Sequence, residues 1–369
     1  MFGFGLSFIS TLLLVYIVWR MSSVPRFSEA VPGKVFFCGG ILVWLIIVGG
    51  RFFGHVEGSA WASLADFIGI TITGVLFLVS VCLFPVDLAT GFGRYFSSIT
   101  PRLRGWAMLG GCLLSVVATI QGVRAPVVIN YEVRLKNLPA ALDGTTLVAL
   151  SDLHLGSVLG ARWLESRVAQ VQPLKPDIIF LLGDIFEGHG ENTEDFAPIF
   201  RKLSAPYGVW SVDGNHENHG KTGGSKSTLE GIQITTLQNE LIEPTPGFVL
   251  AGRSVSRNHD KTTITPPWNP PTTRPLGGLI LLSHFPEDSL GAAQAGVGLM
   301  LSGHTHGGQV WPFSLLVGMA HPMLEGRYQV EAMTLLVCRG TGTWGPRMRL
   351  WQPSEILHIT LRSGELPSG

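Results

Sequence analysis

The sequence predicts an α/β domain preceded by a bundle of four transmembrane helices. Two observations support this fold class. The first part of the 369-residue chain contains four long apolar runs, and the second part contains short apolar runs that end in Gly, Asp, Asn or His. Long apolar runs suit helices that cross a bilayer, whereas short runs bounded by turn residues suit strands that are buried on both faces. We therefore expect a transmembrane helical domain over residues 1–123 and an α/β domain over residues 124–369.

Composition limits the class of protein. Hydrophobic residues make up 46% of the chain and charged residues 14%, with a mean hydropathy of +0.33. Globular proteins carry about 25% charged residues, so the composition excludes a disordered chain and a highly charged soluble protein. Residues 124–369 hold 19 basic and 22 acidic residues. This mildly acidic half has no basic footprint, and we expect no nucleic-acid partner.

The four apolar runs predict membrane-spanning helices and make the lipid bilayer a partner. They cover residues 3–19, 35–50, 61–84 and 106–123. Each approaches or exceeds the ~20 residues that a helix needs to cross the hydrocarbon core. No Lys or Arg precedes Arg20 and no small-residue cleavage site follows the first run, which favours a retained helix over a cleaved signal peptide.

The basic residues near the ends of these runs predict an orientation. Arg20, Arg26 and Lys34 lie in the first connection, Arg51 in the second, and Arg94, Arg102 and Arg104 in the third. Cytoplasmic connections carry the excess of Lys and Arg, which places the first and third connections inside. Residues beyond about 124 are then expected to face the periplasm or the cell exterior.

The second half has the pattern of an α/β domain. The alternating run Val127–Leu135 predicts a strand, and Arg162–Val171 has helical spacing between two strands, as a βαβ unit requires. Residues 253–278 are rich in proline and predict an irregular loop. Continuous apolar runs predict further strands at Thr146–Leu150, Ile178–Leu182, Val209–Val212, Phe248–Ala251, Leu279–Leu282 and Leu299–Leu301.

Polar residues follow five of these strands directly. They are Asp152 and His154, Asp184, Asn215 and His216, His284, and His304 and His306. Sites in α/β sheets collect outside the carboxyl ends of the strands. Carboxylate, imidazole and amide ligands suit Mn²⁺, Fe or Zn²⁺, and the set is too large for one tetrahedral ion. It predicts two ions, and two ions about 3.5–4 Å apart form a clamp for in-line phosphoryl displacement.

In this order the blocks resemble a known family. Asp152-Leu-His154, Gly183-Asp184, Gly214-Asn215-His216-Glu217, His284 and Gly303-His304-Thr-His306 resemble the calcineurin-like metallophosphoesterase superfamily. The resemblance covers about residues 144–361, and residues 151–156 and 302–309 are similar to its bacterial membrane-associated phosphohydrolase branch. It implies a four-layer αββα sandwich with two mixed sheets.

The resemblance also implies roles for the matching residues. One ion would bind Asp152, His154 and His306, the other would bind Asn215, His284 and His304, and Asp184 would bridge the two. The ions would be divalent, with Mn²⁺ first and Fe or Zn²⁺ as alternatives. His216 would not bind an ion but would lie beside the scissile phosphate and protonate the leaving oxygen.

Two departures from the family pattern and one added hypothesis concern neighbouring residues. Glu217 stands where the third block commonly ends in Asp, and Phe285 stands where Asn often follows the fourth-block His. Neither change removes a ligand. Glu187 follows Asp184 by three residues, and we expect it to orient His216 through a hydrogen bond.

The predicted function is a membrane-anchored dinuclear-metal phosphohydrolase. In it a metal-bridging hydroxide would attack a phosphomonoester or phosphodiester of a phosphorylated, lipid-linked or envelope substrate. The expected location is a bacterial inner membrane with the second domain on the periplasmic side. Two alternatives stay open: a nucleotide phosphodiesterase with the same metal site, and a non-catalytic membrane scaffold or sensor. The complete ligand set argues against the scaffold.

Other histidines and tryptophans fall outside the blocks. His189, His219, His259, His321 and His358 are expected to be loop or surface residues. Trp268 and Trp311 are expected to pack in a loop or the core, with contact to an acyl chain or the bilayer interface as the alternative.

The predicted orientation can be tested with reporter fusions at Ala125. Alkaline phosphatase fused there should be active and green fluorescent protein dark, because the fusion point is predicted to lie outside the cytoplasm. Fusions at Arg26, in the first connection, serve as the opposite control. A fluorescent, phosphatase-dead pattern at Ala125 would reject the outside placement.

Overall fold

The computed structural model describes residues 2–53, 60–187, 193–219, 228–255 and 277–364. The chain forms two compact units. The helical unit consists of residues 1–123 and 345–351, and the α/β unit consists of residues 124–344 and 352–369. Most of the proline-rich loop expected over residues 253–278 lies outside the described residues, as do His189, His259 and Trp268.

The helical unit is built from long apolar helices. They are α1 (Phe2–Met21), α3 (Gly33–Phe53), α4 (Ala60–Ala89) and α5 (Thr100–Val123), with the short α2 (Pro25–Ala30) and a 3₁₀ turn, η1 (Gly91–Gly93), between them. Three spans are long and apolar enough to cross a membrane, at Gly33–Phe52, Trp61–Ala89 and Thr100–Val123, and a shorter apolar helix covers Gly5–Met21. The predicted N-terminal helices are thus present. The fourth begins at Thr100, six residues before the apolar run at 106, because Arg102 and Arg104 in its first two turns shorten the run and not the helix.

Charged groups inside the helical unit are paired. Asp87 near the end of α4 is fully buried, and its carboxylate contacts Arg20 of α1 at 2.6 Å and Arg104 of α5 at 2.7 Å. The hydroxyl of Tyr16 donates to the same carboxylate at 2.7 Å. Burying an ionisable group in an apolar bundle costs free energy unless an opposite charge pairs with it. The paired charges of Arg20, Asp87 and Arg104 therefore stabilise the packing of α1, α4 and α5 near the ends of these helices.

The segment Gly345–Trp351 packs within the helical unit although it comes late in the chain. The N–H of Arg349 donates to the carbonyl of Ala118 at 2.9 Å, and the N–H of Trp351 donates to the Gln121 side chain at 2.8 Å. A Cβ on Gly122 would lie 2.5 Å from the Arg347 carbonyl oxygen, so only glycine allows this approach to α5.

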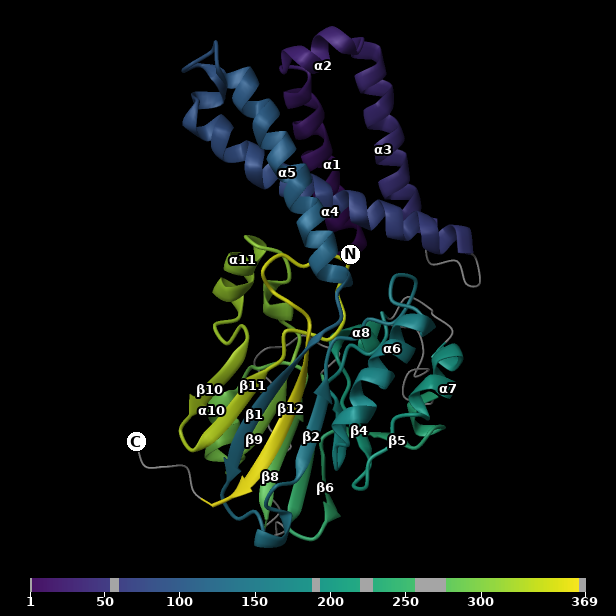
Figure 1. The fold of residues 1–369 in the computed structure, drawn as a ribbon, viewed down its shortest axis with the longest axis vertical. Coiled ribbons are helices and arrows are strands. Elements are labelled where there is room, and N and C mark those ends of the chain that lie inside the picture. The colour runs from purple at the N-terminus through teal and green to yellow at the C-terminus, as the bar shows by residue number, and fades with distance from the viewer. Residues whose placement is uncertain (1, 54–59, 188–192, 220–227, 256–276, 365–369) are drawn as a thin grey trace. The chain divides into compact units, whose positions relative to one another are not determined.

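The α/β unit contains two six-stranded mixed sheets (Figure 1). The first has the order β1-β12-β2-β3-β4-β5 and the second the order β10-β11-β9-β8-β7-β6. The first is formed by β1 (Val127–Leu135), β12 (Glu355–Ser363), β2 (Thr146–Leu150), β3 (Ile178–Leu181), β4 (Val209–Ser211) and β5 (Ile234–Thr236). The second is formed by β10 (Gly326–Val330), β11 (Met333–Val337), β9 (Leu299–Ser302), β8 (Gly278–Ser283), β7 (Phe248–Arg253) and β6 (Glu240–Thr245).

Within each sheet the central strands are parallel. Strands β2, β3, β4 and β5 pair in parallel, as do β7, β8, β9 and β11, whereas β12 runs antiparallel to β2 and β6 antiparallel to β7. The continuous apolar runs of the sequence therefore lie in the parallel core of each sheet, where both faces of a strand are covered.

Alternate residues of each strand enter different cores, which gives the layered architecture. Leu147 of β2 and Ile280 of β8 belong to one cluster between the two sheets. Val148 of β2 packs with residues of α6 (Ala161–Val171) and α7 (Ala197–Phe200) on the outer face of the first sheet. Leu279 of β8 packs with α10 (Ser289–Gln294) on the outer face of the second. The expected αββα sandwich with two mixed sheets is confirmed.

Candidate metal centre

The loops that follow strands of both sheets meet at one place. Asp152 and His154 follow β2 and Asp184 follows β3, while Asn215 and His216 begin α8 (Asn215–His219) after β4. From the second sheet, His284 follows β8 and His304 and His306 follow β9, with His306 starting the short turn η5 (His306–Gly308). Contacts at or below 4.8 Å link seven of these residues in overlapping groups, and Asn215 joins them through His284.

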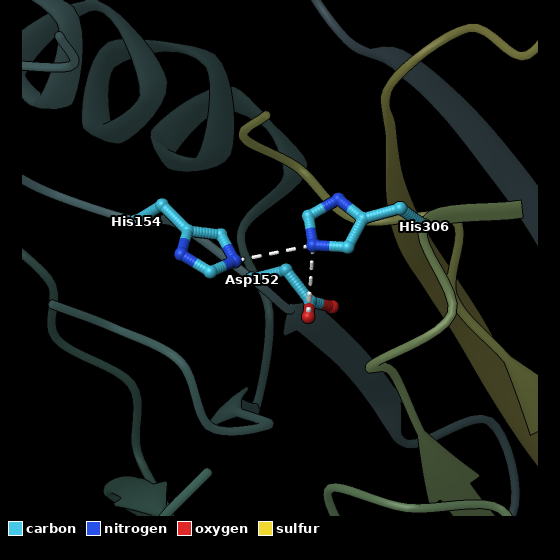
Figure 2. A group of neighbouring side chains, drawn as sticks. All are labelled: Asp152, His154 and His306. Atoms are coloured by element: carbon cyan, nitrogen blue, oxygen red, sulfur yellow. Dashed lines mark hydrogen bonds and ion pairs between the residues drawn. The ribbon is translucent and has the colours of Figure 1, made fainter. Parts of the chain in front are cut away.

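Asp152, His154 and His306 form one group (Figure 2). The Nε2 atoms of His154 and His306 lie 3.1 Å apart, and Nε2 of His306 lies 3.4 Å from Oδ1 of Asp152. Figure 2 shows the two rings turned toward one another next to the Asp152 carboxylate. Two imidazole nitrogens and one carboxylate oxygen are thus directed at a common point.

Asp184, His284 and His304 form a second group, which Asp184 connects to the first. Oδ2 of Asp184 lies 3.2 Å from Nε2 of His284 and 3.8 Å from Nε2 of His154. The same His284 nitrogen lies 3.2 Å from Oδ1 of Asn215. The Asp184 carboxylate therefore stands between the two sets of ligands.

The donor atoms and their proton positions fit divalent metal ions. Nδ1 of His154 contacts the Glu187 carboxylate at 2.8 Å, and Nδ1 of His284 contacts the carbonyl of Leu182 at 2.8 Å. Each of these oxygens accepts a hydrogen bond from Nδ1, so the ring directs Nε2 into the cluster, where its lone pair becomes available to an ion once Nε2 has lost its proton. Imidazole, carboxylate and amide oxygen together are ligands of Mn²⁺, Fe and Zn²⁺.

The backbone at the cluster is strained. Asp152, His154 and Asp184 have φ angles of 54°, 46° and 49°, and His304 and His306 have φ angles of 69° and 51°. A non-glycine residue in this left-handed region costs of order 1 kcal/mol and persists only where the surroundings enforce it. Such outliers cluster at functional sites because they direct side chains that ordinary turns would point elsewhere.

Two glycines let the loops approach one another. A Cβ on Gly214 would lie 2.1 Å from Oδ1 of Asp184, and a Cβ on Gly303 would lie 1.8 Å from the Ser151 hydroxyl oxygen. No side chain fits at either position. The glycines beside the ligands are therefore required by close packing of the loops, which is within the first sheet at Gly214 and between the two sheets at Gly303.

Glu217 fixes the conformation of the loop at Asp184 through hydrogen bonds. Its carboxylate accepts hydrogen bonds from the N–H groups of Asp184, Ile185, Phe186 and Gly214, at 2.7 to 3.0 Å. The sequence showed Glu217 only as a departure from the family pattern. Its role depends on a loop more than 30 residues away, and no local signal in the sequence indicates that partner.

Glu187 contacts two histidines through different groups. We expected it to orient His216, and Nδ1 of His216 does donate to Glu187, but to the main-chain carbonyl, at 2.8 Å. The carboxylate contacts Nδ1 of His154 instead. The His216 N–H in turn donates to Oδ1 of Asp184 at 2.9 Å.

Three further aromatic residues border the cluster, and the motifs indicated only Phe285, as a departure from the family pattern. The ring centroids of Phe285 and His304 are 4.1 Å apart, and those of Trp344 and His216 are 6.5 Å apart. His321, expected to be a loop or surface residue, has its ring 5.2 Å from His304. The side chain of Gln309 fixes Trp344 by accepting from its N–H at 2.9 Å and donating to its carbonyl at 2.8 Å.

Burial distinguishes a closed side of the cluster from an open one. Asp152, His154, Asp184 and His284 are at most 3% exposed. Asn215, His216 and His304 are partly exposed. A ligand from solvent therefore reaches the cluster from the side of these three residues.

Charge within the cluster shifts the pKa values of its imidazoles. Burial lowers the pKa of His154, but Glu187, Asp184 and Asp152 outweigh it and raise the pKa to about 9. The pKa of His284 is likewise lowered by burial and raised by Asp184 and Asp152, to about 10. Burial and the proximity of His284 lower the pKa of His304 to about 2.

Replacing Glu187 by Gln should weaken metal binding about tenfold or more, because a neutral amide does not raise the basicity of His154 as the carboxylate does. The measurement is isothermal titration of Mn²⁺ into the purified full chain. Glu165→Gln is the matched control, since Glu165 is exposed and paired with Lys202. Unchanged affinity with slower turnover would instead favour the side-chain role on His216.

Metal affinity should fall as the pH is lowered. His154 and His284 hold protons below about pH 9 and 10, and an ion must displace these protons to reach the ring nitrogens. Titrations at about pH 7 and 8.5, in buffers of different ionisation enthalpy, should show proton release and tighter binding at the higher pH. Binding without proton release at pH 7 would contradict this expectation.

The α/β unit is similar to known phosphoesterases. Residues 145–308 match the family model for the calcineurin-like phosphoesterase domain. A transmembrane protein with metallophosphoesterase domain from Danio rerio is 28% identical, with 97% of this chain and 89% of the relative covered. Uncharacterized metallophosphoesterases of Campylobacter jejuni and Bacillus subtilis are 27% and 29% identical. They cover 79% and 63% of this chain, and the matches span 81% and 85% of their own lengths.

The matched region includes every strand end that carries a candidate ligand, from Asp152 to His306. The resemblance that the sequence motifs indicated is thereby confirmed. Residues 145–308 thus carry the signature of a calcineurin-like phosphoesterase domain, and the chain is similar over most of its length to proteins named metallophosphoesterases.

Proposed function

We propose that this chain is a membrane-anchored phosphohydrolase with two metal ions at the cluster. The observation that carries the proposal is the position of the Asp184 carboxylate between His154 and His284. A carboxylate between two sets of imidazole ligands is suited to bridge two ions. The helices of the N-terminal unit supply the anchor.

The ligands divide between the two sheets and the two ions. Asp152, His154 and His306 would hold one ion, and Asn215, His284 and His304 would hold the other, with Asp184 shared. Mn²⁺ fits this mixture of oxygen and nitrogen donors, as do Fe and Zn²⁺. Bound ions would activate water and neutralise the phosphate oxygens of a substrate.

His216 would donate a proton to the leaving oxygen. Its Nδ1 donates to the Glu187 carbonyl, so Nε2 is the ring nitrogen that would carry the donated proton. Its main-chain N–H contacts Asp184, so the ring is fixed relative to the bridging carboxylate. The Trp344 ring lies beside it, with the two ring centroids 6.5 Å apart.

The substrate would be a phosphomonoester or phosphodiester of a lipid-linked or envelope compound. The partly exposed residues Asn215, His216 and His304 would receive its phosphate. The mild acidity of residues 124–369 disfavours nucleic acid. The location would be a bacterial plasma membrane, and the distribution of basic residues supports a periplasmic or external side for the α/β unit.

Asp184→Asn should abolish hydrolysis of bis-p-nitrophenyl phosphate by the purified full chain with Mn²⁺, because the amide cannot bridge two cations as a carboxylate does. His216→Ala should retain metal but lose about 10²–10⁴ in kcat through loss of the general acid. Asp143→Asn is the control, since Asp143 is an exposed carboxylate of the same unit. Equal activity in Asp184→Asn would refute the two-metal site.

A further inference from the structure

The α/β unit exposes a concentrated apolar surface outside the metal cluster. In its described residues, seven large apolar side chains are exposed, and five of them lie between Trp311 and Met319. These five are Trp311, Phe313, Leu315, Leu316 and Met319, and the exposed fractions of the last three are 62%, 60% and 82%. We call this set the α11 surface, after the helix α11 (Phe313–Ala320) that carries four of the five.

The helix α11 exposes its apolar side chains and buries a polar one, which is the reverse of an ordinary surface helix. Its one buried residue is the small, polar Ser314, whereas its leucines face outward. Residues 307–320 contain no charged side chain. An amphipathic helix on a soluble domain places apolar residues inside and charges outside, so α11 is built to contact an apolar medium.

The α11 surface is joined rigidly to the metal cluster. The residues between His306 and Phe313 include Gly308, where a Cβ would lie 2.2 Å from the Cα of Ser314. The backbone of η5, which starts at the ligand residue His306, is therefore packed directly against the first turn of α11. Figure 1 shows α11 beyond the ends of β10 and β11, away from the layers of the sandwich.

The covalent structure of the chain indicates what covers this surface. Only Arg124, Ala125 and Pro126 separate the end of α5 from the start of β1, and three residues reach at most about 11 Å when extended. If α5 crosses a bilayer, the α/β unit is held at the bilayer surface. The nearest apolar medium for an uncharged, outward-facing helix is then the boundary between headgroups and acyl chains.

We propose that the α11 surface inserts into the bilayer interface and holds the metal cluster beside the headgroup layer. The aliphatic face of α11 would enter the acyl boundary to a depth of about 5–10 Å, with Trp311 at headgroup level. The cluster would then meet phosphate groups presented by the membrane rather than free in solution. This inference rests on the membrane anchorage in the proposed function, but its test does not require catalysis.

The test measures the surroundings of nitroxide labels on the full chain in bilayer nanodiscs. Single cysteines at Leu316, Leu290 and Leu45 are labelled in a variant without the four native cysteines, whose folding is checked by size exclusion and metal binding. Leu290, on α10, is 52% exposed and is the matched water-facing control; Leu45, on α3, is 53% exposed and reports the membrane-spanning helices. Collisions with lipid-soluble oxygen are compared with collisions with a water-soluble nickel chelate.

A ratio of oxygen to nickel collisions several-fold higher at Leu316 than at Leu290 supports the proposal, and Met319→Cys should behave as Leu316→Cys does. Water-like values at Leu316 with lipid-like values at Leu45 overturn it while leaving the anchorage intact. Water-like values at both positions overturn the anchorage as well. Spin–spin broadening at Leu316 that disappears on dilution with unlabelled protein would show a second copy on this surface and would also overturn the proposal.

Discussion

Burial of both faces of two stacked sheets is the constraint from which the position of the metal cluster follows. Each central strand has one set of side chains in the core between the sheets and the other set under helices or loops. Charged side chains and metal ligands are costly to bury along such strands, so they occur where the strands end. Because the central strands of each sheet are parallel, their carboxyl ends lie together, and the two sheets bring two sets of loops to one place.

The cluster concentrates groups that are costly to bury. Asp152, Asp184, His154 and His284 are almost fully buried, and each charge is tolerated only because an opposite charge or a hydrogen bond is close. The left-handed backbone at five of the candidate ligands adds a further cost. The surrounding structure offsets it through specific contacts, of which the Glu217 carboxylate with its four N–H donors is the clearest. Such a site is suited to cations, since a bound cation would offset the repulsion between the buried carboxylates that the fold holds together.

The sequence predicted the candidate ligands better than it predicted the residues that hydrogen-bond to them and hold their loops. The order of Asp, His and Asn residues after apolar runs was enough to indicate which side chains would meet, because the ends of parallel strands are neighbours whatever the loops do. Supporting contacts followed no such rule. Glu187 and Glu217 are both glutamates close to a motif, yet one supports His154 and the other holds a loop, and loop conformation alone decides which. The neighbours Trp344 and His321 come from loops after the last motif, where spacing carries no information about distance in space.

The sequence by itself determined the long apolar helices, the strands of the α/β unit and the residues that follow those strands, because hydrophobic periodicity and turn residues act over short stretches of chain. Only the tertiary structure decided that the Glu217 carboxylate holds the Asp184 loop, that Glu187 turns its carboxylate to His154, and that α11 presents its apolar side outward. Each of these depends on how segments distant in sequence pack against one another. The direction of a side chain at a loop or helix surface is set by that packing and not by its neighbours in the chain.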